Sequence, residues 1–556
     1  MPDKIKRTGG GAIVDCLRRE KVPFVFGVPG GQTLGIMDAL YHTPEVRFIT
    51  VHDERAAAHM ADGYARATGR PGVCLTTTGP GATNLLTGIG GALHDSSPVI
   101  AITANNRGKD LARDDAQEAD HIALLRSLTK WSVLVTDVGR IPHAVREAFR
   151  RSRAHSPGPV HLDFTREILE SEEVEFEPLE PAQYRSESRP QGDPTLIEQA
   201  AALLEQAKAP TIWAGRGVLV SEATKAVIGL AEKTGAAVLT TYNGIGAVPA
   251  DHPQALGPLS RHGTEVTKKA LAETDVLVTI GASLNAPTTS RWQLELPKKL
   301  IQIDCDAAMI GRHYPFTVGI SGDAASVAGQ LCEAVQGPDA AAGEQRRSRI
   351  AGLQDAKRAW KNRIFPDASS QSKPIKPQYL MKALREALPR DAIIVGGAGN
   401  PGIWTNLIDV YEPRTYMKPV GFGNMGFSLP AAIGAKLARP GRLVACVIGD
   451  GSLGMCISEI ETAVREKAPV LIVLMDNFAY GNIKQEQETF FGGRCLGVDF
   501  SDIDFAAIAR GFGAQGRRVE DPAELPAALS EAAASGSTYL LDVIIDPGEN
   551  VWTEPF

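Results

Sequence analysis

Residues 443–482 read LVACVIGDGSLGMCISEIETAVREKAPVLIVLMDNFAYGN, and this stretch decides the fold. An apolar run at 443–448 breaks at Gly449-Asp450-Gly451-Ser452, an amphipathic segment follows at 457–466, and a second apolar run covers 470–475. This order predicts a strand, a tight turn, a helix and a second strand. A right-handed crossover would bring both strand ends to one edge of a parallel sheet, where ligands usually bind.

The turn has the chemistry of a site for a metal-held diphosphate. Two glycines let the backbone approach an anion closely, and a helix beginning near Ser452 would point unpaired N–H groups at it. Asp450 and Asn477, 27 residues apart, offer hard oxygen ligands for magnesium or calcium. For this motif alone, an ordinary turn whose aspartate caps the helix is an equal alternative. The asparagine at the next strand end favours the metal site.

The size and charge of the chain limit the classes of protein to consider. A length of 556 residues is too great for one hydrophobic core and suggests about three or four domains. The chain is 43% hydrophobic and 22% charged, as is typical of a soluble globular protein. A net charge of −7 argues against nucleic acid or an anionic membrane as the main partner.

Cysteines and terminal segments indicate the compartment. The seven cysteines have no CxxC or metal-binding spacing and lie mostly within apolar runs, so they are predicted to be buried, reduced thiols of a cytoplasmic protein. The first residues lack an uninterrupted apolar core and a small-residue cleavage site, so no secretory signal is expected. No window approaches about 18 consecutive apolar residues, so no transmembrane helix is expected.

Residues 11–180 alternate helical and strand patterns and predict an α/β domain with a parallel sheet. At the end of the predicted strand 47–51 stands His52-Asp53-Glu54-Arg55, which opens a helix at 54–68. Acidic residues are favoured at a helix start, so capping alone would explain Asp53 and Glu54. A functional role for Glu54 depends on the rest of the chain.

Four stretches together resemble thiamine-diphosphate enzymes of the acetolactate synthase branch. They are the GDGS turn with Asn477, the phrases HDERAAAHMADGYARATGRPG (52–72) and TTTGPGATNLLTGIGGALHDSSPVIAIT (76–103), and GFGNMGFSLPAAIGAKLA (421–438). The resemblance covers essentially the whole chain. It implies three consecutive doubly wound α/β domains with parallel sheets: a pyrimidine-binding domain at 1–180, a central Rossmann-like domain at 193–340, and a diphosphate- and metal-binding domain at 372–556.

The resemblance assigns residues to the cofactor and the metal. Asp450, the Asn477 side chain and the carbonyl of Ala479 would bind Mg²⁺, and Met425 would form an apolar wedge under the bent thiamine diphosphate. Glu54 would hydrogen-bond the pyrimidine ring and promote the imino tautomer that generates the ylid. The other residues implied to contact the cofactor are Pro29, Asn84, Gly399, Asn400, Pro401, Gly423, Asn424, Gly449, Gly451, Ser452, Tyr480, Gly481, Asn482 and Ile483.

Further residues would face the reacting centre if the resemblance holds. The Gly30-Gly31-Gln32 loop carries Gln32 where the family usually has alanine, which places a polar amide near the substrate. Thr77 and Thr78 stand in a loop where some members carry a catalytic histidine, so they could only orient groups by hydrogen bonds. Gln117 matches the family's active-site glutamine, and Gly31 is assigned to the same centre.

The substrate pocket is predicted where the chain departs from the family pattern. Ala116 replaces the usual phenylalanine before Gln117, which reshapes the pocket, and Leu124 is assigned to the same pocket. On the segment 480–488, Glu486 occupies the position of the family's tryptophan, and Lys484 lies beside it. A solvated helix face is the alternative for these charges. If one faces the cofactor, the substrate is more polar than the usual pair of 2-oxo acids, as in 2-hydroxyacyl-CoA lyases, which also carry a glutamate there.

Two polar stretches, 180–192 and 338–375, are predicted to be linkers on either side of the central domain. The central domain has no GxGxxG motif. FAD-type relatives have an arginine-rich segment after Gly281, whereas this chain reads ASLNAP, so FAD or an adenine nucleotide is not expected there. Asp304 could hydrogen-bond a ribose, but it could equally cap a helix.

The resemblance implies decarboxylation of a 2-oxo acid such as pyruvate and transfer of the acyl anion to a second carbonyl. A 2-hydroxyacyl-CoA lyase or an oxalyl-CoA-type decarboxylase is the alternative, and a non-catalytic cofactor-binding protein is disfavoured by the intact Glu54. Active sites between the pyrimidine domain of one subunit and the diphosphate domain of another imply a homodimer or a homotetramer. Because the C-terminal segment DPGENVWTEPF is short, no large appended lid is expected.

Overall fold

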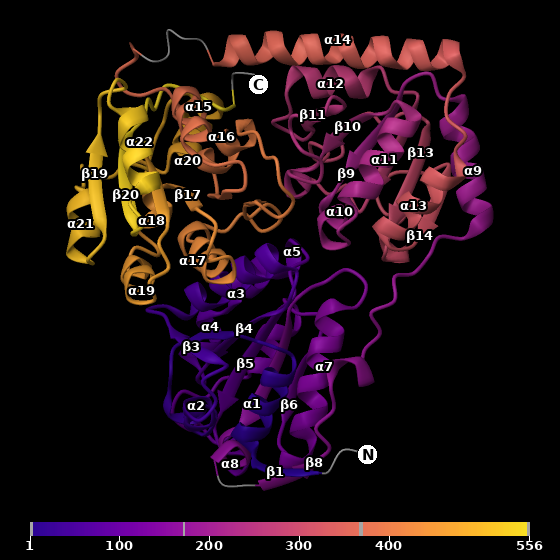
Figure 1. Ribbon diagram of the computed structural model, residues 1–556. Helices are drawn as coiled ribbons and strands as arrows, with labels where there is room; N and C mark the ends of the chain where they lie inside the picture. The colour runs from indigo at the N-terminus through magenta and orange to yellow at the C-terminus, as the bar shows by residue number, and fades with distance from the viewer. Residues whose placement is uncertain (1–3, 171–172, 366–370, 553–556) are drawn as a thin grey trace.

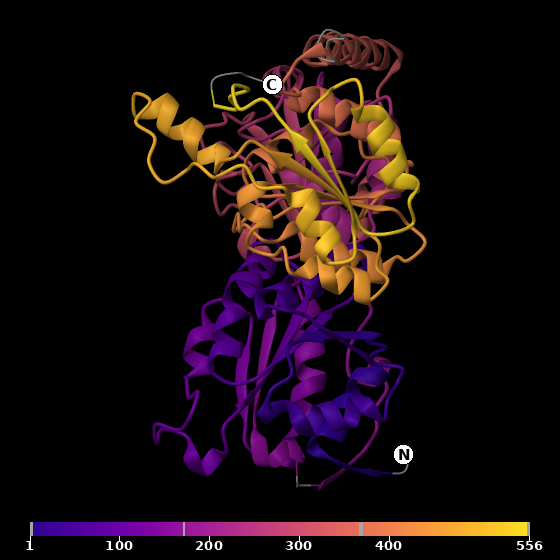
Figure 2. The same ribbon diagram turned by 90° about the vertical axis from the view of Figure 1, so that its left-hand side faces the viewer.

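The computed structural model describes residues 4–170, 173–365 and 371–552. Three six-stranded sheets follow one another along the chain, and every strand pair within them is parallel. Helices flank each sheet, and the first domain lies below the other two in both views (Figure 1 and Figure 2). The predicted fold class, three consecutive parallel-sheet α/β domains, is therefore confirmed.

The first sheet has the strand order β3-β2-β4-β5-β7-β6. A separate antiparallel pair, β1 (Ile5–Thr8) and β8 (Glu173–Phe176), ties the start of the domain to its end. The sheet strands are β2 (Phe24–Gly27), β3 (Arg47–Thr50), β4 (Gly72–Thr76), β5 (Val99–Asn105), β6 (Ser132–Val135) and β7 (Val160–Thr165). The helices are α1 (Gly9–Arg19), α2 (Leu34–Tyr41), α3 (Glu54–Thr68), α4 (Pro80–Asn84), α5 (Leu86–His94), α6 (His121–Arg126), α7 (Ile141–Arg153) and α8 (Arg166–Glu170).

The central sheet has the order β11-β10-β9-β12-β13-β14. Its strands are β9 (Pro210–Ala214), β10 (Ala237–Thr240), β11 (Ala255–Pro258), β12 (Val276–Ile280), β13 (Lys299–Asp304) and β14 (Val318–Ser321). The helices are α9 (Pro194–Gln206), α10 (Arg216–Val220), α11 (Thr224–Thr234), α12 (Glu265–Ala272) and α13 (Ala324–Ala334). The linker predicted at 180–192 contains only the short 3₁₀ turn Pro181–Gln183, as expected.

The second predicted linker is wrong over most of its length. Residues Ala340–Ile364 form the 25-residue helix α14, which lies across the top of Figure 1. Its buried large side chains, Arg346, Leu353 and Trp360, recur every seven residues and form a narrow stripe on an otherwise polar helix. Such a narrow stripe gives a weak amphipathic signal, which is why composition alone suggested a linker. Residues 366–370 of that stretch lie outside the described residues.

The third sheet has the order β16-β15-β17-β18-β20-β19 and contains the stretch 443–482. β17 and β18 pair in parallel, as predicted, and the helix after the GDGS turn begins at Asp450 itself. The strands are β15 (Ile393–Gly396), β16 (Tyr416–Met417), β17 (Val444–Gly449), β18 (Leu471–Asp476), β19 (Gln515–Val519) and β20 (Tyr539–Ile544). The helices are α15 (Pro377–Ala387), α16 (Asn400–Trp404), α17 (Ser428–Ala438), α18 (Asp450–Leu453), α19 (Glu459–Arg465), α20 (Gly481–Phe490), α21 (Phe505–Gly511) and α22 (Leu525–Ala534).

Helices α3 and α17 join the first and third domains in one shared hydrophobic core (Figure 1). Their backbones touch: a Cβ on Gly63 would lie 2.1 Å from the carbonyl oxygen of Ala431, and a Cβ on Gly434 would lie 2.1 Å from that of Met60. Glycine is therefore required at both positions. The contact fixes the start of α3, which carries Glu54, relative to the loop that precedes α17.

The cysteines and helices test two further expectations. All seven cysteines are free, but only four are buried (Cys16, Cys74, Cys446 and Cys456), whereas Cys332 and Cys495 are half-buried and Cys305 is exposed. The prediction of buried thiols is wrong for these three. Cys305 and Cys495 lie outside helices and strands, and Cys332 lies on a partly exposed face of α13. Within the described ranges, no helix has the length and apolar character needed to cross a membrane.

Candidate active site

The Asp450 carboxylate connects two loops at the carboxyl edge of the third sheet. Its Oδ1 accepts a hydrogen bond from the Gly451 amide (2.7 Å), and its Oδ2 accepts one from the Ala479 amide (2.9 Å). A Cβ on Gly481 would lie 2.4 Å from Asn477 Nδ2, so the asparagine side chain folds over that glycine. The three predicted metal ligands thus belong to adjoining loops after β17 and β18.

The donor set fits a divalent cation. Burial and the neighbouring Asp476 carboxylate raise the pKa of Asp450 to about 7. The Asp476 Oδ2 and both Asp542 carboxylate oxygens are buried without a hydrogen-bond partner, and burial raises the pKa of Asp542 to about 8. A cation beside Asp450 would compensate this negative charge. No cluster of three or more His, Cys, Asp or Glu suited to a metal occurs in the part of the chain that is described, but magnesium commonly uses one or two carboxylates together with substrate phosphates.

Further predicted cofactor residues meet at the same edge. Asn482 Nδ2 donates to Asn400 Oδ1 (2.9 Å), which links α20 to α16. Gly399, the residue before α16, has a φ of +68°. Ser452 Oγ accepts from the Gly426 amide (2.9 Å), which links the GDGS turn to the loop 423–426. These hydrogen bonds hold the loops together at the edge of the sheet where the diphosphate is predicted to bind.

The loop 423–426 presents Met425 outward. Met425 is 36% exposed, whereas the neighbouring Asn424 is buried, with its Nδ2 3.3 Å from His59 Nε2. Asn424 therefore packs against α3, and its Oδ1 is buried without a hydrogen-bond partner. Gly423 and Gly426 have φ values of +65° and +79°, which explains the glycines on both sides of the projecting methionine.

The two adjacent acids at the start of α3 have different partners. Asp53 caps the helix, because its Oδ1 accepts from the Arg55 amide (2.7 Å). Glu54 is not used in the cap, and its Oε2 accepts from Asn84 Nδ2 (2.9 Å) of α4. Capping therefore explains Asp53 alone and leaves the Glu54 carboxylate available to a ligand.

The side chain of Gln32 is held at both ends. Its Oε1 accepts from Thr77 Oγ1 (2.7 Å), and its Nε2 donates to Asn106 Oδ1 (3.0 Å). Thr78, in contrast, is fully buried and its Oγ1 donates to the Gln117 carbonyl (3.3 Å). Both threonines thus orient other groups by hydrogen bonds.

The residues predicted for the substrate pocket lie near the surface of the single chain. Ala116 and Gln117 are exposed, and Leu124 is 36% exposed. Lys484 forms an ion pair with Asp499 (2.7 Å), which agrees with the solvated-face alternative for this lysine, and Glu486 is half-exposed on the same helix.

Sequence reasoning missed three polar residues that help to connect these loops: His121, Asp163 and Gln485. His121, buried at 1% exposure, accepts from the Gly79 amide (3.0 Å) and contacts Asp163. Gln485, also buried, accepts from Asn400 Nδ2 (3.1 Å) and donates to the Glu549 carbonyl (2.8 Å). A polar residue four positions after Gln117, in an otherwise apolar helix, was the signal for His121.

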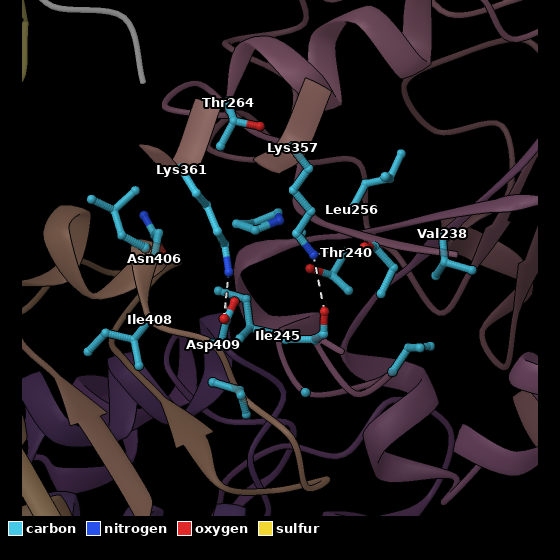
Figure 3. A pocket seen from close by; sticks show the side chains of 18 of the residues that line it. Val238, Thr240, Ile245, Leu256, Thr264, Lys357, Lys361, Asn406, Ile408 and Asp409 are labelled. Atoms are coloured by element: carbon cyan, nitrogen blue, oxygen red, sulfur yellow. Dashed lines mark hydrogen bonds and ion pairs between the residues drawn. The ribbon is translucent and has the colours of Figure 1, made fainter. Parts of the chain in front are cut away.

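The central domain contains a turn-capping aspartate and borders a cavity. Asp304 accepts from the Asp306 amide (3.0 Å), as a turn-capping residue does. A cavity between β10, β11, α14 and residues 406–410 lies outside the predicted site (Figure 3). Lys357 and Lys361 enter it side by side from α14, and Lys361 pairs with Asp409 (2.5 Å).

Comparison with known proteins adds an independent finding. Residues 7–124, 197–331 and 397–543 match the N-terminal TPP binding domain, the central domain and the C-terminal TPP binding domain of thiamine pyrophosphate enzymes. The probable acetolactate synthase large subunit of Methanocaldococcus jannaschii is 37% identical, over 97% of this chain and 92% of that protein. The acetolactate synthase isozyme 2 large subunit of Escherichia coli is 35% identical, over 97% and 96%. The acetolactate synthase large subunit of Corynebacterium glutamicum is 34% identical, over 98% of this chain and 88% of that protein.

Proposed function

The chain belongs to the thiamine pyrophosphate enzymes and is related to acetolactate synthase large subunits over nearly its full length, and from this we propose a specific reaction. The protein decarboxylates a 2-oxo acid such as pyruvate and transfers the acyl anion to a second carbonyl, with thiamine diphosphate and Mg²⁺. The observation that carries the proposal is the Glu54 carboxylate, which is free of the helix cap and is held by Asn84.

When bound, thiamine diphosphate supplies the carbanion chemistry that no side chain can provide. The chain's own residues would hold it in place. Asp450, which the Gly451 and Ala479 amides hold in place, would bind the Mg²⁺ together with Asn477 and the Ala479 carbonyl. The next backbone amides at the start of α18 would bind the diphosphate. Glu54 would hold and move a proton at the pyrimidine ring.

Gln32 would act on the substrate. One hydrogen of its Nε2 is used by Asn106, and the second is available to an oxygen of the substrate. Because Thr77 and Asn106 fix the amide at both ends, little rotamer freedom is lost when the substrate binds. This position supports a substrate with a carboxylate or a carbonyl oxygen.

We further propose that the active enzyme is a homodimer or a homotetramer. The exposed apolar side chains near the predicted cofactor residues include Phe422, Met425, Ile483 and Phe490, with exposures of 36–61%. Apolar side chains gathered around a polar site commonly mark a surface that a partner covers. A second subunit would cover them and complete the pocket.

A parallel assay tests the reaction and separates it from the alternatives. Purified protein with thiamine diphosphate and Mg²⁺ is offered pyruvate alone, pyruvate with 2-oxobutyrate, and a 2-hydroxyacyl-CoA. Release of carbon dioxide with formation of a 2-hydroxy-2-alkyl-3-oxo acid supports the proposal. Cleavage of the 2-hydroxyacyl-CoA alone, at the bond between its C1 and C2 and with release of an aldehyde, would favour the lyase, for which Glu486 on α20 is the supporting residue.

The variant Glu54→Gln is the internal control. It should abolish turnover and leave the affinity for thiamine diphosphate within a few-fold, because the amide still pairs with Asn84 and the diphosphate loops are unchanged. Full activity of this variant would sink the role given to Glu54. Cofactor binding by the unmodified protein without turnover of any of these substrates would favour a non-catalytic function.

A further inference from the structure

A buried histidine lies at the centre of the loops that carry the predicted catalytic groups of the first domain. His121 is the first residue of α6, and its ring is 1% exposed. Its Nε2 lies 3.0 Å from the Gly79 amide and 3.3 Å from Thr78 Oγ1. Its Nδ1 lies 3.0 Å from Asp163 Oδ1 at the end of β7. The ring therefore contacts three separate segments.

These distances determine the protonation of the ring. The Gly79 amide can only donate, so His121 Nε2 must accept and carry no hydrogen. The remaining hydrogen is then on Nδ1, where the Asp163 carboxylate accepts it. Asp163 is itself fixed, because it accepts from Thr103 Oγ1 (2.6 Å) and from Asn105 Nδ2 (2.8 Å). The carboxylate thus selects the tautomer that Gly79 requires.

The turn that His121 holds requires glycine and is crowded. Gly79 has a φ of +57° and a ψ of −109°, and a Cβ there would lie 2.2 Å from the Gln117 carbonyl oxygen. Gly79 also forms the N-cap of α4, the helix whose Asn84 pairs with Glu54. A shift of this turn would therefore displace both Gln117 and the partner of Glu54.

We propose that His121, oriented by Asp163, is a positioning residue: it accepts the Gly79 amide hydrogen and so holds the turn that places Gln117 and the Asn84–Glu54 pair. The activity measurement that tests this inference rests on the proposed function, whereas the hydrogen-exchange measurement does not. The other polar groups around the ring are already engaged, since Thr103 Oγ1 and Asn105 Nδ2 donate to Asp163 and Thr78 Oγ1 donates to the Gln117 carbonyl.

Two variants separate the hydrogen bonds from the packing. His121→Gln offers an acceptor to Gly79 and a donor to Asp163, whereas His121→Leu fills a similar volume and offers neither. The matched control is His143→Leu, an exposed histidine on α7 of the same domain. All proteins are measured as holoenzymes at saturating Mg²⁺ and thiamine diphosphate.

The expected result has an activity part and a structural part. His121→Leu lowers kcat/KM on the order of 10- to 100-fold, as small misplacements of catalytic groups do, while His121→Gln stays within about threefold, the level expected when a hydrogen-bond pattern is preserved. Hydrogen exchange of the Gly79 amide is faster in His121→Leu and unchanged in His121→Gln.

The contrary outcomes are equally distinct. An unchanged kcat/KM in His121→Leu, or unaltered hydrogen exchange of the Gly79 amide in that variant, would each overturn the proposal. If His121→Leu does not fold, His121→Gln still decides, because faster exchange at Gly79 with kcat/KM unchanged in that variant would show that the turn does not place the catalytic groups. Hydrogen exchange needs no substrate, so a lack of turnover in the unmodified protein would contradict the proposed function without affecting this test.

Discussion

The close contact between α3 and α17 predicts that adding a single methyl group there lowers the stability of the protein. Gly434→Ala would add a Cβ 2.1 Å from the Met60 carbonyl oxygen, 2.8 Å from its carbon and 3.0 Å from its Cα. All three atoms are backbone, so no flexible side chain can move aside. The two helices must separate by roughly 1 Å to restore ordinary van der Waals contact.

The expected magnitude follows from two opposing terms. Overpacking a close contact costs typically about 1–3 kcal/mol, and replacing a mid-helix glycine by alanine returns about 1 kcal/mol. Backbone against backbone places the cost at the upper end, so the net loss is about 2 kcal/mol. For a cooperative unit of 150–250 residues this lowers Tm by roughly 4–8 °C.

A second glycine provides the control. Gly329 lies in α13, where no atom is within 4 Å of an added Cβ, so Gly329→Ala should raise Tm because only the helix-propensity term remains. Scanning calorimetry of both variants, with thiamine diphosphate affinity measured in parallel, tests the pair. Gly434→Ala should also bind the cofactor more weakly, because α3 carries Glu54 and α17 follows Met425. Equal Tm shifts in the two variants would refute the reasoning.

Three other outcomes follow from the site. Since only the ionised Asp450 binds a cation and its pKa is raised to about 7, Mg²⁺ affinity should be about tenfold weaker at pH 6 than at pH 8; equal affinities by titration calorimetry would contradict this. Gln485→Ala should weaken thiamine diphosphate binding about tenfold, because Asn400 loses the hydrogen-bond partner that orients it. The control Gln487→Ala, on the same helix, should leave the affinity unchanged. Ala116→Phe should shift kcat/KM toward small substrates; an unchanged ratio between pyruvate and a bulky 2-oxo acid would show that Ala116 does not line the pocket.

The parallel fold could be predicted because its signal is local. Each strand, such as 444–449 or 471–476, is a short apolar run bounded by a turn, and parallel strands buried on both faces have this pattern. Helix α14 could not be predicted, because Leu353 and Trp360 bury only a narrow stripe and the rest of the helix is polar. These side chains become buried only when they pack against residues of the central and third domains, which are distant in sequence.

The candidate site divides in the same way. Asp450 and Asn477 could be placed together from sequence, because the carboxyl ends of neighbouring parallel strands share an edge. The contact between His121 and Asp163 could not, since it depends on β5 lying beside β7 and on α6 returning over both. Motifs predict which side chains reach the edge, whereas the packing between domains decides how those side chains are held.

Asp53 and Glu54 show how the same local pattern separates into two roles. The backbone of Asp53 is extended, with φ −144° and ψ 129°, which is the conformation in which a side chain can turn back onto the first helical amides. Glu54 already has helical geometry, so its side chain points away from those amides and cannot cap them. Its partner must come from another element, and Asn84 reaches it only because the Gly79 turn directs α4 toward α3. The position of the proposed proton-transfer group therefore depends on a turn 25 residues away in sequence, and that turn depends on His121.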